Sequence, residues 1–272
     1  MDANPKAASL LWARNAWRIK IFWLAGTIIA VVLGFTATVC AQTDEIQVYD
    51  AEINKPGQFS VTWQNNYTAI GRKQSAFPGG IVPNHDLNGN LEWAYGVTDW
   101  LEPGVMSPVY SLTGNTHLLY DASRIRALLV VPDAHDRAFF YGVNFELGYN
   151  TRHWDQSRWA GEIRPIAGYR IGPVDLIFNP ILDTAFDGIA ALDFAPAERV
   201  AYNFSETRAG ALELYEDFGR LKDIAPVEEQ GQTLFVVVDY KGEPDSVEFG
   251  VGHGFTAASD TLIFKLMLTH TF

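Results

Sequence analysis

The sequence contains a single cysteine, Cys40, among its 272 residues. One cysteine cannot build a disulfide framework, so packing and strand pairing must stabilise the fold. Long uncharged runs are also scarce, because only residues 21–39 approach the length of about 20 residues that a membrane-spanning helix needs. Basic residues number 20 against 32 acidic residues, and the formal charge is -12. Such a chain should repel the polyanionic backbone of nucleic acids, which excludes a nucleic-acid-binding role.

The uncharged run has the surroundings of a targeting sequence. Arg14, Arg18 and Lys20 precede it, and the small-residue stretch Val39-Cys40-Ala41 follows it. This order predicts a secretory signal peptide over residues 1–41, cleaved after Ala41, and therefore export from the cytoplasm. The run is longer than the usual h-region of roughly 7–15 residues, which leaves an uncleaved inner-membrane anchor open. Cys40 leaves a lipoprotein open, although Ala37-Thr38-Val39 fits a lipobox poorly.

From residue 42 onward, apolar and polar residues alternate in segments of about ten residues, with almost no helical periodicity. Alternation is typical of a strand with two different faces. A tilted strand crosses the hydrocarbon layer with about 9–11 residues, whereas strands of soluble proteins more often have about 5–6. We predict twelve strands, over residues 58–68, 90–98, 101–111, 118–131, 137–150, 157–171, 174–183, 192–204, 207–216, 232–240, 245–255 and 260–272.

The connections between these segments alternate between short and long. Those after the even-numbered strands are short, and the longest, residues 69–89 and 217–231, follow odd-numbered strands. This is typical of a barrel with short periplasmic turns and long outer loops. We therefore predict an all-β fold: a closed, antiparallel, up-and-down transmembrane β-barrel over residues 58–272, after a periplasmic lead-in over residues 42–57. The alternative is a soluble sandwich or lipocalin-like barrel whose core holds the aromatic residues.

Aromatic residues make up 13% of the chain, which suits girdles at the two membrane interfaces. The candidates for these girdles are Trp63, Trp93, Trp159, Tyr169, Tyr202 and Tyr240.

The C-terminal segment 262–272 resembles the last strand of bacterial outer-membrane barrels, in which a terminal aromatic after alternating apolar residues is read by the barrel-assembly machinery. The residues that carry this resemblance are Phe264, Leu266, Leu268 and Phe272, while His270 departs from the more usual apolar choice. Residues 92–104 are similar to a hairpin of many such barrels, including the phenol-degradation meta-pathway outer-membrane proteins. The span 45–272 resembles a poorly characterised proteobacterial barrel family. The resemblance implies an outer-membrane location in a Gram-negative cell and supplies no catalytic residues.

Charges of both signs lie on the polar faces of the segments and should face the lumen. We predict as lumen-lining residues Glu92, Glu146, Glu162, Arg164, Arg170, Asp175, Asp183, Asp239, Glu248 and Lys265. Opposed charges at a constriction select small solutes by their local field, so we expect a passive channel whose mouth is gated by loops 69–89 and 217–231. The alternative is a structural barrel, in which the same charges plug a lumen narrower than that of the 16–18-stranded porins.

A lipid-modifying enzyme of the outer membrane is the remaining alternative. No G-x-S-x-G motif occurs, and only His253 and His270 lie on predicted strands. His85, His117, His135 and His153 have no metal-ligand spacing. We therefore expect no enzymatic activity, no cofactor and no metal. The expected partners are outer-membrane lipid and lipopolysaccharide, the barrel-assembly machinery and a small-molecule solute.

Overall fold

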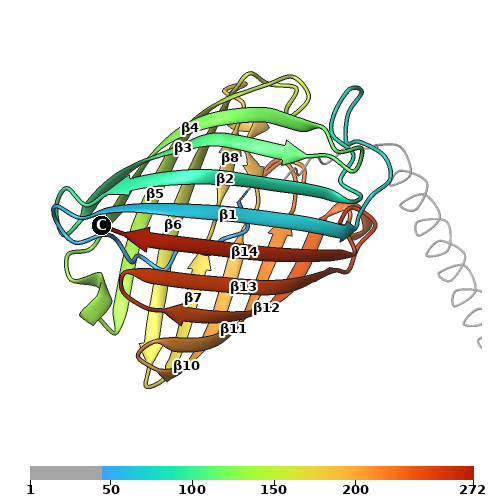
Figure 1. Ribbon diagram of the computed structural model, residues 1–272. Coiled ribbons are helices and arrows are strands. Elements are labelled where there is room, and N and C mark those ends of the chain that lie inside the picture. Colours follow the sequence, from blue (N-terminus) through green and yellow to red (C-terminus); the bar gives the residue numbers. More distant parts are fainter. Residues whose placement is uncertain (1–44) are drawn as a thin grey trace, which may run out of the picture. The chain divides into compact units, whose positions relative to one another are not determined.

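The computed structural model describes residues 45–272, so the predicted signal peptide over residues 1–41 lies outside the described residues. Twelve long strands form one antiparallel sheet that closes on itself (Figure 1). They are β1 (Phe59–Ile70), β2 (Asp86–Tyr95), β3 (Leu101–Leu112), β4 (Leu118–Val130), β5 (Phe139–Asn150), β6 (Trp159–Ile171), β7 (Val174–Asn179), β10 (Ala197–Ser205), β11 (Arg208–Asp217), β12 (Gly231–Lys241), β13 (Asp245–Gly254) and β14 (Leu262–Thr271). The predicted closed, twelve-stranded, all-β barrel is confirmed.

The first and last strands close the barrel, and they lie side by side in Figure 1. Their pairing runs from Ser60 opposite Thr271 to Ile70 opposite Leu262. Each of the remaining long strands pairs with the long strands that precede and follow it in the chain, including β5 with β6. The pairing of β1 with β14 removes the two free edges that an open sheet would have, which is the condition for a sheet surrounded by lipid.

The longest connections lie at one end of the barrel, as predicted, although residues 113–117 are as few as residues 96–100 and residues 131–138 are as many as residues 151–158. One end of the barrel, here called the short-turn end, carries residues 96–100, 131–138, 172–173, 206–207 and 242–244. The other end, the loop end, carries residues 71–85, 113–117, 151–158, 180–196, 218–230 and 255–261. The C-terminus lies at the short-turn end (Figure 1).

Two predicted strands are shorter in the structure than in the sequence analysis. The strand predicted over 174–183 ends at Asn179, before Pro180, and the strand predicted over 192–204 begins only at Ala197, after Pro196. Proline has no N–H to donate to a ladder, so it interrupts both strands. The chain between them forms two small strands at the loop end, β8 (Leu182–Thr184) and β9 (Asp193–Phe194), of which β8 pairs with β6.

Three single turns of 3₁₀ helix complete the described elements: η1 (Ala134–Asp136), η2 (Ile189–Ala191) and η3 (Val227–Glu229). Over residues 45–272, no helix has the length and apolar character needed to cross a bilayer.

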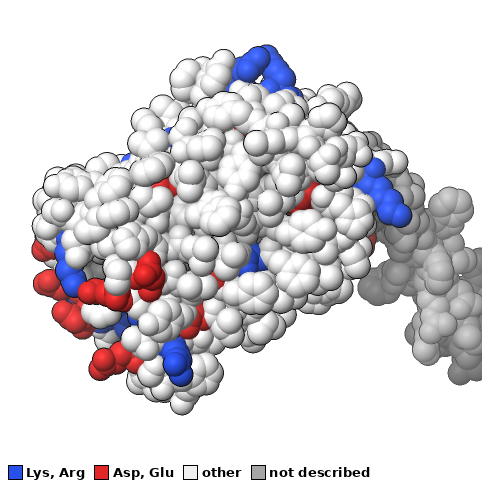
Figure 2. All heavy atoms as spheres, viewed as in Figure 1, with Lys and Arg blue, Asp and Glu red and all other residues white. Residues whose placement is uncertain are grey.

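The outer wall exposes large apolar side chains. Figure 2 shows one side of the barrel as a broad uncharged surface, with carboxylates gathered at the short-turn end, on the left. The predicted girdle residues Trp63, Trp93, Trp159, Tyr169, Tyr202 and Tyr240 are all exposed, between 40% and 53%. By contrast, many polar side chains are fully buried, among them Gln64, Asn90 and Lys265. This distribution is the inverse of that in a water-soluble protein.

The inner wall also carries buried aromatic rings, and glycines on neighbouring strands make room for them. A Cβ atom at Gly168 would lie 2.0 Å from the Phe140 ring, and one at Gly252 would lie 2.4 Å from the Phe235 ring. These glycines therefore permit close approach of the rings, which is one role that glycine has inside strands.

Candidate functional site in the barrel lumen

Part of the described chain before the first strand lies inside the barrel. Its residues 45–54, here called the lumen segment, include the buried residues Glu45, Ile46, Val48, Tyr49 and Ala51. Each of these side chains is at most 6% exposed. The lead-in predicted over residues 42–57 therefore runs through the lumen over much of its described part, and residues 42–44 lie outside the described residues.

Apolar packing gives the physical reason for this placement. Val48, Tyr49 and Ala51 join one buried cluster with Phe140 and Ile166, which are residues of the inner wall. Ile46 joins a second cluster, which includes Phe235, Val237 and Ile263. Part of the inner wall is therefore apolar, and the lumen segment shields it from water.

A side chain of the wall pairs with the backbone of the lumen segment. The Tyr49 N–H donates to Asn179 Oδ1 (2.7 Å), and Asn179 Nδ2 donates to the Tyr49 carbonyl oxygen (3.0 Å). The Asn179 amide thus replaces a neighbouring strand for this residue and satisfies two backbone groups that would otherwise be buried without partners. We call this pair the Asn179 latch.

Cations of the wall hold the lumen segment at three further points. Lys265 Nζ donates to the Ile46 carbonyl oxygen (3.3 Å), and Arg164 Nη1 donates to the Gln47 carbonyl oxygen (3.0 Å). The Arg164 guanidinium also lies 4.6 Å from the centre of the Tyr49 ring. Such cation–π contacts gain strength where water is excluded.

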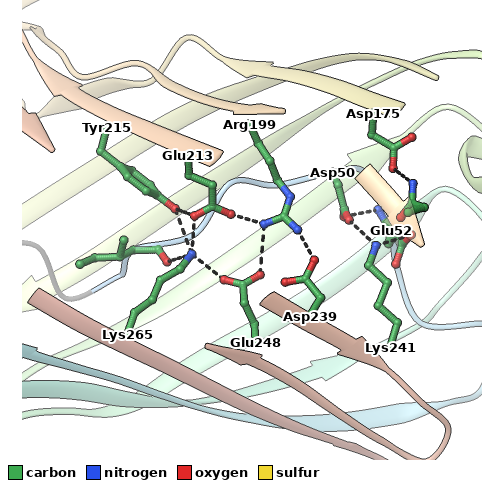
Figure 3. A network of polar contacts seen from close by, with 12 residues as sticks. Asp50, Glu52, Asp175, Arg199, Glu213, Tyr215, Asp239, Lys241, Glu248 and Lys265 are labelled. Atoms are coloured by element: carbon green, nitrogen blue, oxygen red, sulfur yellow. Dashed lines mark hydrogen bonds and ion pairs between the residues drawn. The ribbon is translucent and has the colours of Figure 1, made fainter. Parts of the chain in front are cut away.

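Two ionic clusters flank the lumen segment, and Figure 3 shows the first. Arg199 contacts the carboxylates of Glu213, Asp239 and Glu248. Lys265 contacts Glu213 and, at 2.5 Å, Glu248. The five residues come from β10, β11, β12, β13 and β14, so this Arg199–Lys265 cluster joins adjacent strands from inside.

The second cluster lies on strands β2, β3, β4 and β6. Arg126 contacts Glu92 and, at 2.7 Å, Glu102. Arg164 donates to both carboxylate oxygens of Glu162, at 2.7 and 2.9 Å, and lies 3.6 Å from Glu45 of the lumen segment. Buried ions need partners of this kind because an unpaired charge is costly to desolvate.

The predicted lumen-lining residues fall into four groups. Glu92, Glu162, Arg164, Asp239, Glu248 and Lys265 belong to the two ionic clusters. Glu146 is also buried and accepts from Asn144 Nδ2 at 2.7 Å. Arg170 and Asp175 form a separate pair at 3.8 Å, near the short-turn end, and Asp183 lies on β8 opposite Glu162.

Four central members of the clusters were not predicted from the sequence: Glu102, Arg126, Arg199 and Glu213. Each has the strand parity of an inward-facing residue, and all four are buried. The alternation along these strands indicated that the four residues face inward, but it was weak, because small apolar residues such as Ala201 and Ala211 share the inner face with them.

The short-turn end of the lumen segment is held by polar contacts. The Asn54 N–H donates to Glu102 Oε2 (2.6 Å), and Asn54 Nδ2 donates to Ser60 Oγ (2.7 Å). Lys241 lies 3.4 Å from Glu52, and His135 lies 3.7 Å from the same carboxylate. Glu52, as a hydrogen-bond acceptor with a negative charge, raises the pKa of His135. Burial opposes the ionisation of Glu52, but His135 and Lys241 outweigh it and lower the pKa of Glu52.

The described residues also contain a serine, an aspartate and a histidine in contact, at the loop end. The Ser111 hydroxyl donates to Asp121 Oδ2 (2.5 Å), and Asp121 Oδ1 lies 2.9 Å from His153 Nε2. The carboxylate therefore separates the hydroxyl from the imidazole, whereas nucleophile activation requires the imidazole next to the hydroxyl.

The two histidines on predicted strands have other neighbours. His270 Nδ1 lies 2.7 Å from Asp245 Oδ1, and the His253 ring packs against Phe255. Within residues 45–272, no group of three or more His, Cys, Asp or Glu residues is placed to hold a metal ion.

The residues of the predicted assembly signal lie on the outside of β14. Phe264, Leu266 and Leu268 are partly exposed beside β1, and the Phe272 ring lies 5.8 Å from that of Phe59. Recognition of this strand by the assembly machinery stays a prediction.

Comparisons with known proteins agree with the fold. The KdgM porin superposes with a TM-score of 0.51, at 10% sequence identity, over 78% of this chain and 99% of that one. LpxR from Salmonella typhimurium covers 78% of this chain and all of its own, with 9% identity and a TM-score of 0.41. No protein-family model matches the sequence, and no curated protein matches it significantly. The similarity to the KdgM porin shows that this chain shares the β-barrel fold.

Proposed function

We propose that this protein is an outer-membrane channel for small solutes that is closed by its own lumen segment. The observation that carries the proposal is the burial of residues 45–51 within a barrel whose inner wall is charged. Solutes pass when the lumen segment leaves the lumen, and they then meet the two ionic clusters.

The outer wall supports the membrane location. Long strands with exposed Trp, Tyr, Phe, Leu and Val side chains form the uncharged surface in Figure 2. Exposure of so much contiguous apolar surface to water would be unfavourable, since monomeric soluble proteins rarely expose apolar patches larger than a few hundred Å². In lipid the same surface is solvated, and the closed sheet has no unpaired edge.

The charged residues of the inner wall support the proposal that the channel selects solutes by their charge. Arg126, Arg164, Arg199 and Lys265 each have at least one carboxylate partner on the wall itself. These ion pairs remain when the lumen segment leaves, so the wall of the open lumen still carries charges of both signs. Fixed charges of this kind set which ions and small solutes pass.

A planar-bilayer measurement tests the proposal. The full-length protein is compared with a variant that lacks residues 45–54, and folding of both is checked by heat-modifiable migration. We expect small or rare currents from the full-length protein and steady currents from the deletion variant. A matched control removes the side-chain contacts of Asn144, an inner-wall residue that donates to Glu146 rather than to the lumen segment.

A structural barrel with a permanent plug is the second candidate, and the same buried segment favours it. Equal, steady currents from both proteins would contradict closure by the lumen segment. If the folded deletion variant carries no current at all, the channel is refuted and the structural barrel is favoured.

A further inference from the structure

A groove lies on the outside of the barrel at the loop end, away from the lumen. Its volume is about 500 Å³, and its walls include Leu147 of β5, Trp159 of β6 and Phe186 of the loop after β8. Two arginines of the 151–158 loop, Arg152 and Arg158, complete it. We call it the rim groove. It joins the apolar outer wall to a pair of positive charges.

Both guanidinium groups are oriented by backbone carbonyls of their own loop region. Arg152 Nη1 donates to the Gln156 carbonyl oxygen, and Arg158 Nη1 donates to that of Asn150 (3.4 Å). Arg158 also lies over the Tyr149 ring, 5.7 Å from its centre. A guanidinium has several N–H donors, so one such contact leaves others for an external acceptor.

Neither arginine has a carboxylate partner within residues 45–272, although acidic residues are in excess in this chain. Neither guanidinium of the rim groove is therefore held in an ion pair by the described part of the protein. Arginine pairs bind phosphate through charge-assisted and often bidentate hydrogen bonds. The complementary ligand is an anion that carries phosphate.

The apolar side of the groove indicates what else the ligand carries. Leu147, Trp159 and Phe186 are 38%, 53% and 57% exposed. Trp159 is the first residue of β6, where tryptophan side chains mark the boundary between acyl chains and headgroups. A ligand that fills the groove therefore has a phosphate at the level of the arginines and hydrocarbon along the wall.

Phe186 gives a second, independent indication of a binding site. Its φ of 64° lies in the left-handed region, where a bulky residue is an outlier. Its N–H donates to Thr184 Oγ1 (2.9 Å), and its ring lies over Gly161, where a Cβ atom would be only 2.9 Å away. The surroundings thus hold an exposed aromatic ring in a strained conformation, as is frequent at ligand sites.

We infer that the rim groove binds a phosphorylated lipid of the outer leaflet, with its phosphate on Arg152 and Arg158 and an acyl chain along Trp159 and Phe186. The inference rests on the membrane location within the proposed function, but not on conduction through the lumen.

Native mass spectrometry of the full-length protein in detergent micelles tests the inference. The probes are bisphosphorylated lipid A, the same lipid A without its phosphates, and inorganic phosphate. We expect the Arg152→Ala/Arg158→Ala variant to bind lipid A at least about tenfold more weakly, since hydrogen bonds to charged groups are each strong enough for such a change. Trp159→Ala should weaken lipid A binding without affecting the weak binding of inorganic phosphate.

Arg137→Ala is the matched control. Arg137 is also exposed and also donates to a backbone carbonyl, that of Pro132, but at the short-turn end. It should leave lipid A binding unchanged. Equal binding by the double arginine variant, or equal binding of lipid A with and without phosphates, overturns the inference. Full competition by inorganic phosphate at the concentration of lipid A overturns the lipid part.

The result of the lipid A binding test can be distinguished from the result of the conductance test. The variant without residues 45–54 should bind lipid A as the full-length protein does, whatever its conductance. A failure of the membrane location itself has its own readout, because the protein would then stay soluble without detergent and would not float with lipid vesicles.

Discussion

The Asn179 latch gives the sharpest test of whether the lumen segment moves. Asn179→Ala removes both hydrogen bonds to Tyr49, at 2.7 and 3.0 Å, and touches no charged group of the two clusters. Each bond stabilises the closed arrangement by about 0.5–1.5 kcal/mol net. In the displaced segment, water satisfies the same groups. The variant should therefore lose about 2 kcal/mol of preference for the closed state, which is about a thirtyfold increase in the displaced population.

Reaction of a buried thiol measures that population. Val48 is 6% exposed, and cysteine behaves as a small apolar side chain in such a place. In a Cys40→Ser background, Val48→Cys becomes the only thiol of the chain. A maleimide then reacts only when the lumen segment is displaced, so its rate follows the population of the displaced state.

We expect Asn179→Ala to raise the labelling rate of Val48→Cys about thirtyfold. Asn144→Ala removes an equally buried amide of the wall, but one that donates to Glu146 and not to the lumen segment. It should therefore change the labelling rate less than about twofold. Equal rates in both variants would refute the latch. A rate in the unsubstituted background as fast as that of a free thiol would show that the segment is not held at all.

Two further predictions concern charge. Lys265→Met should lower the free energy of unfolding in urea, followed by tryptophan fluorescence, by about 3 kcal/mol. The reason is that Glu213 and Glu248 lose one of their two cations, while Arg199 remains. The control Lys55→Met, which removes the cation of an exposed ion pair, should leave the free energy of unfolding almost unchanged. Because Glu52 raises the pKa of His135, their pairing is fully present below the ordinary histidine pKa of about 6.5 and is lost as the pH rises through the raised value. Labelling of Val48→Cys, normalised to an unfolded thiol, should thus rise toward alkaline pH by no more than about fivefold, and the rise should vanish in His135→Ala.

The barrel could be predicted from the sequence because its signal is local. Alternation along each segment, as in Phe139–Asn150, specifies a strand with two faces, and twelve such segments with alternating connections specify closure. The strand ends were less accessible. β2 begins at Asp86, four residues before the predicted start at residue 90, because residues 86–89 still pair with β1.

The position of residues 45–54 could not be predicted in the same way. No strand pairs with them, so neither register nor alternation specifies where they lie. Their partners are side chains far along the chain, with Asn179 130 residues beyond Tyr49 and Lys265 219 residues beyond Ile46. Only a closed barrel brings these groups together, and the sequence specifies that closure only through its strands. The same reason explains why the ionic clusters appeared only as a set of inward charges, without their pairing.

The energetics of the lumen segment favour a displaceable closure over a permanent core. Burial of Ile46, Val48 and Tyr49 contributes about 1.5–3 kcal/mol for each side chain. The hydrogen bonds to Asn179, Lys265 and Arg164 contribute about 1 kcal/mol each. Fixing the backbone of residues 45–51 costs about 1–2 kcal/mol per residue. Gain and cost are both about 10 kcal/mol, so the closed and displaced states differ by only a small part of either sum. A change of about 2 kcal/mol, as at the Asn179 latch, is then enough to alter how often the lumen opens. A plug made of strands paired into the sheet would not be displaced by so small a change.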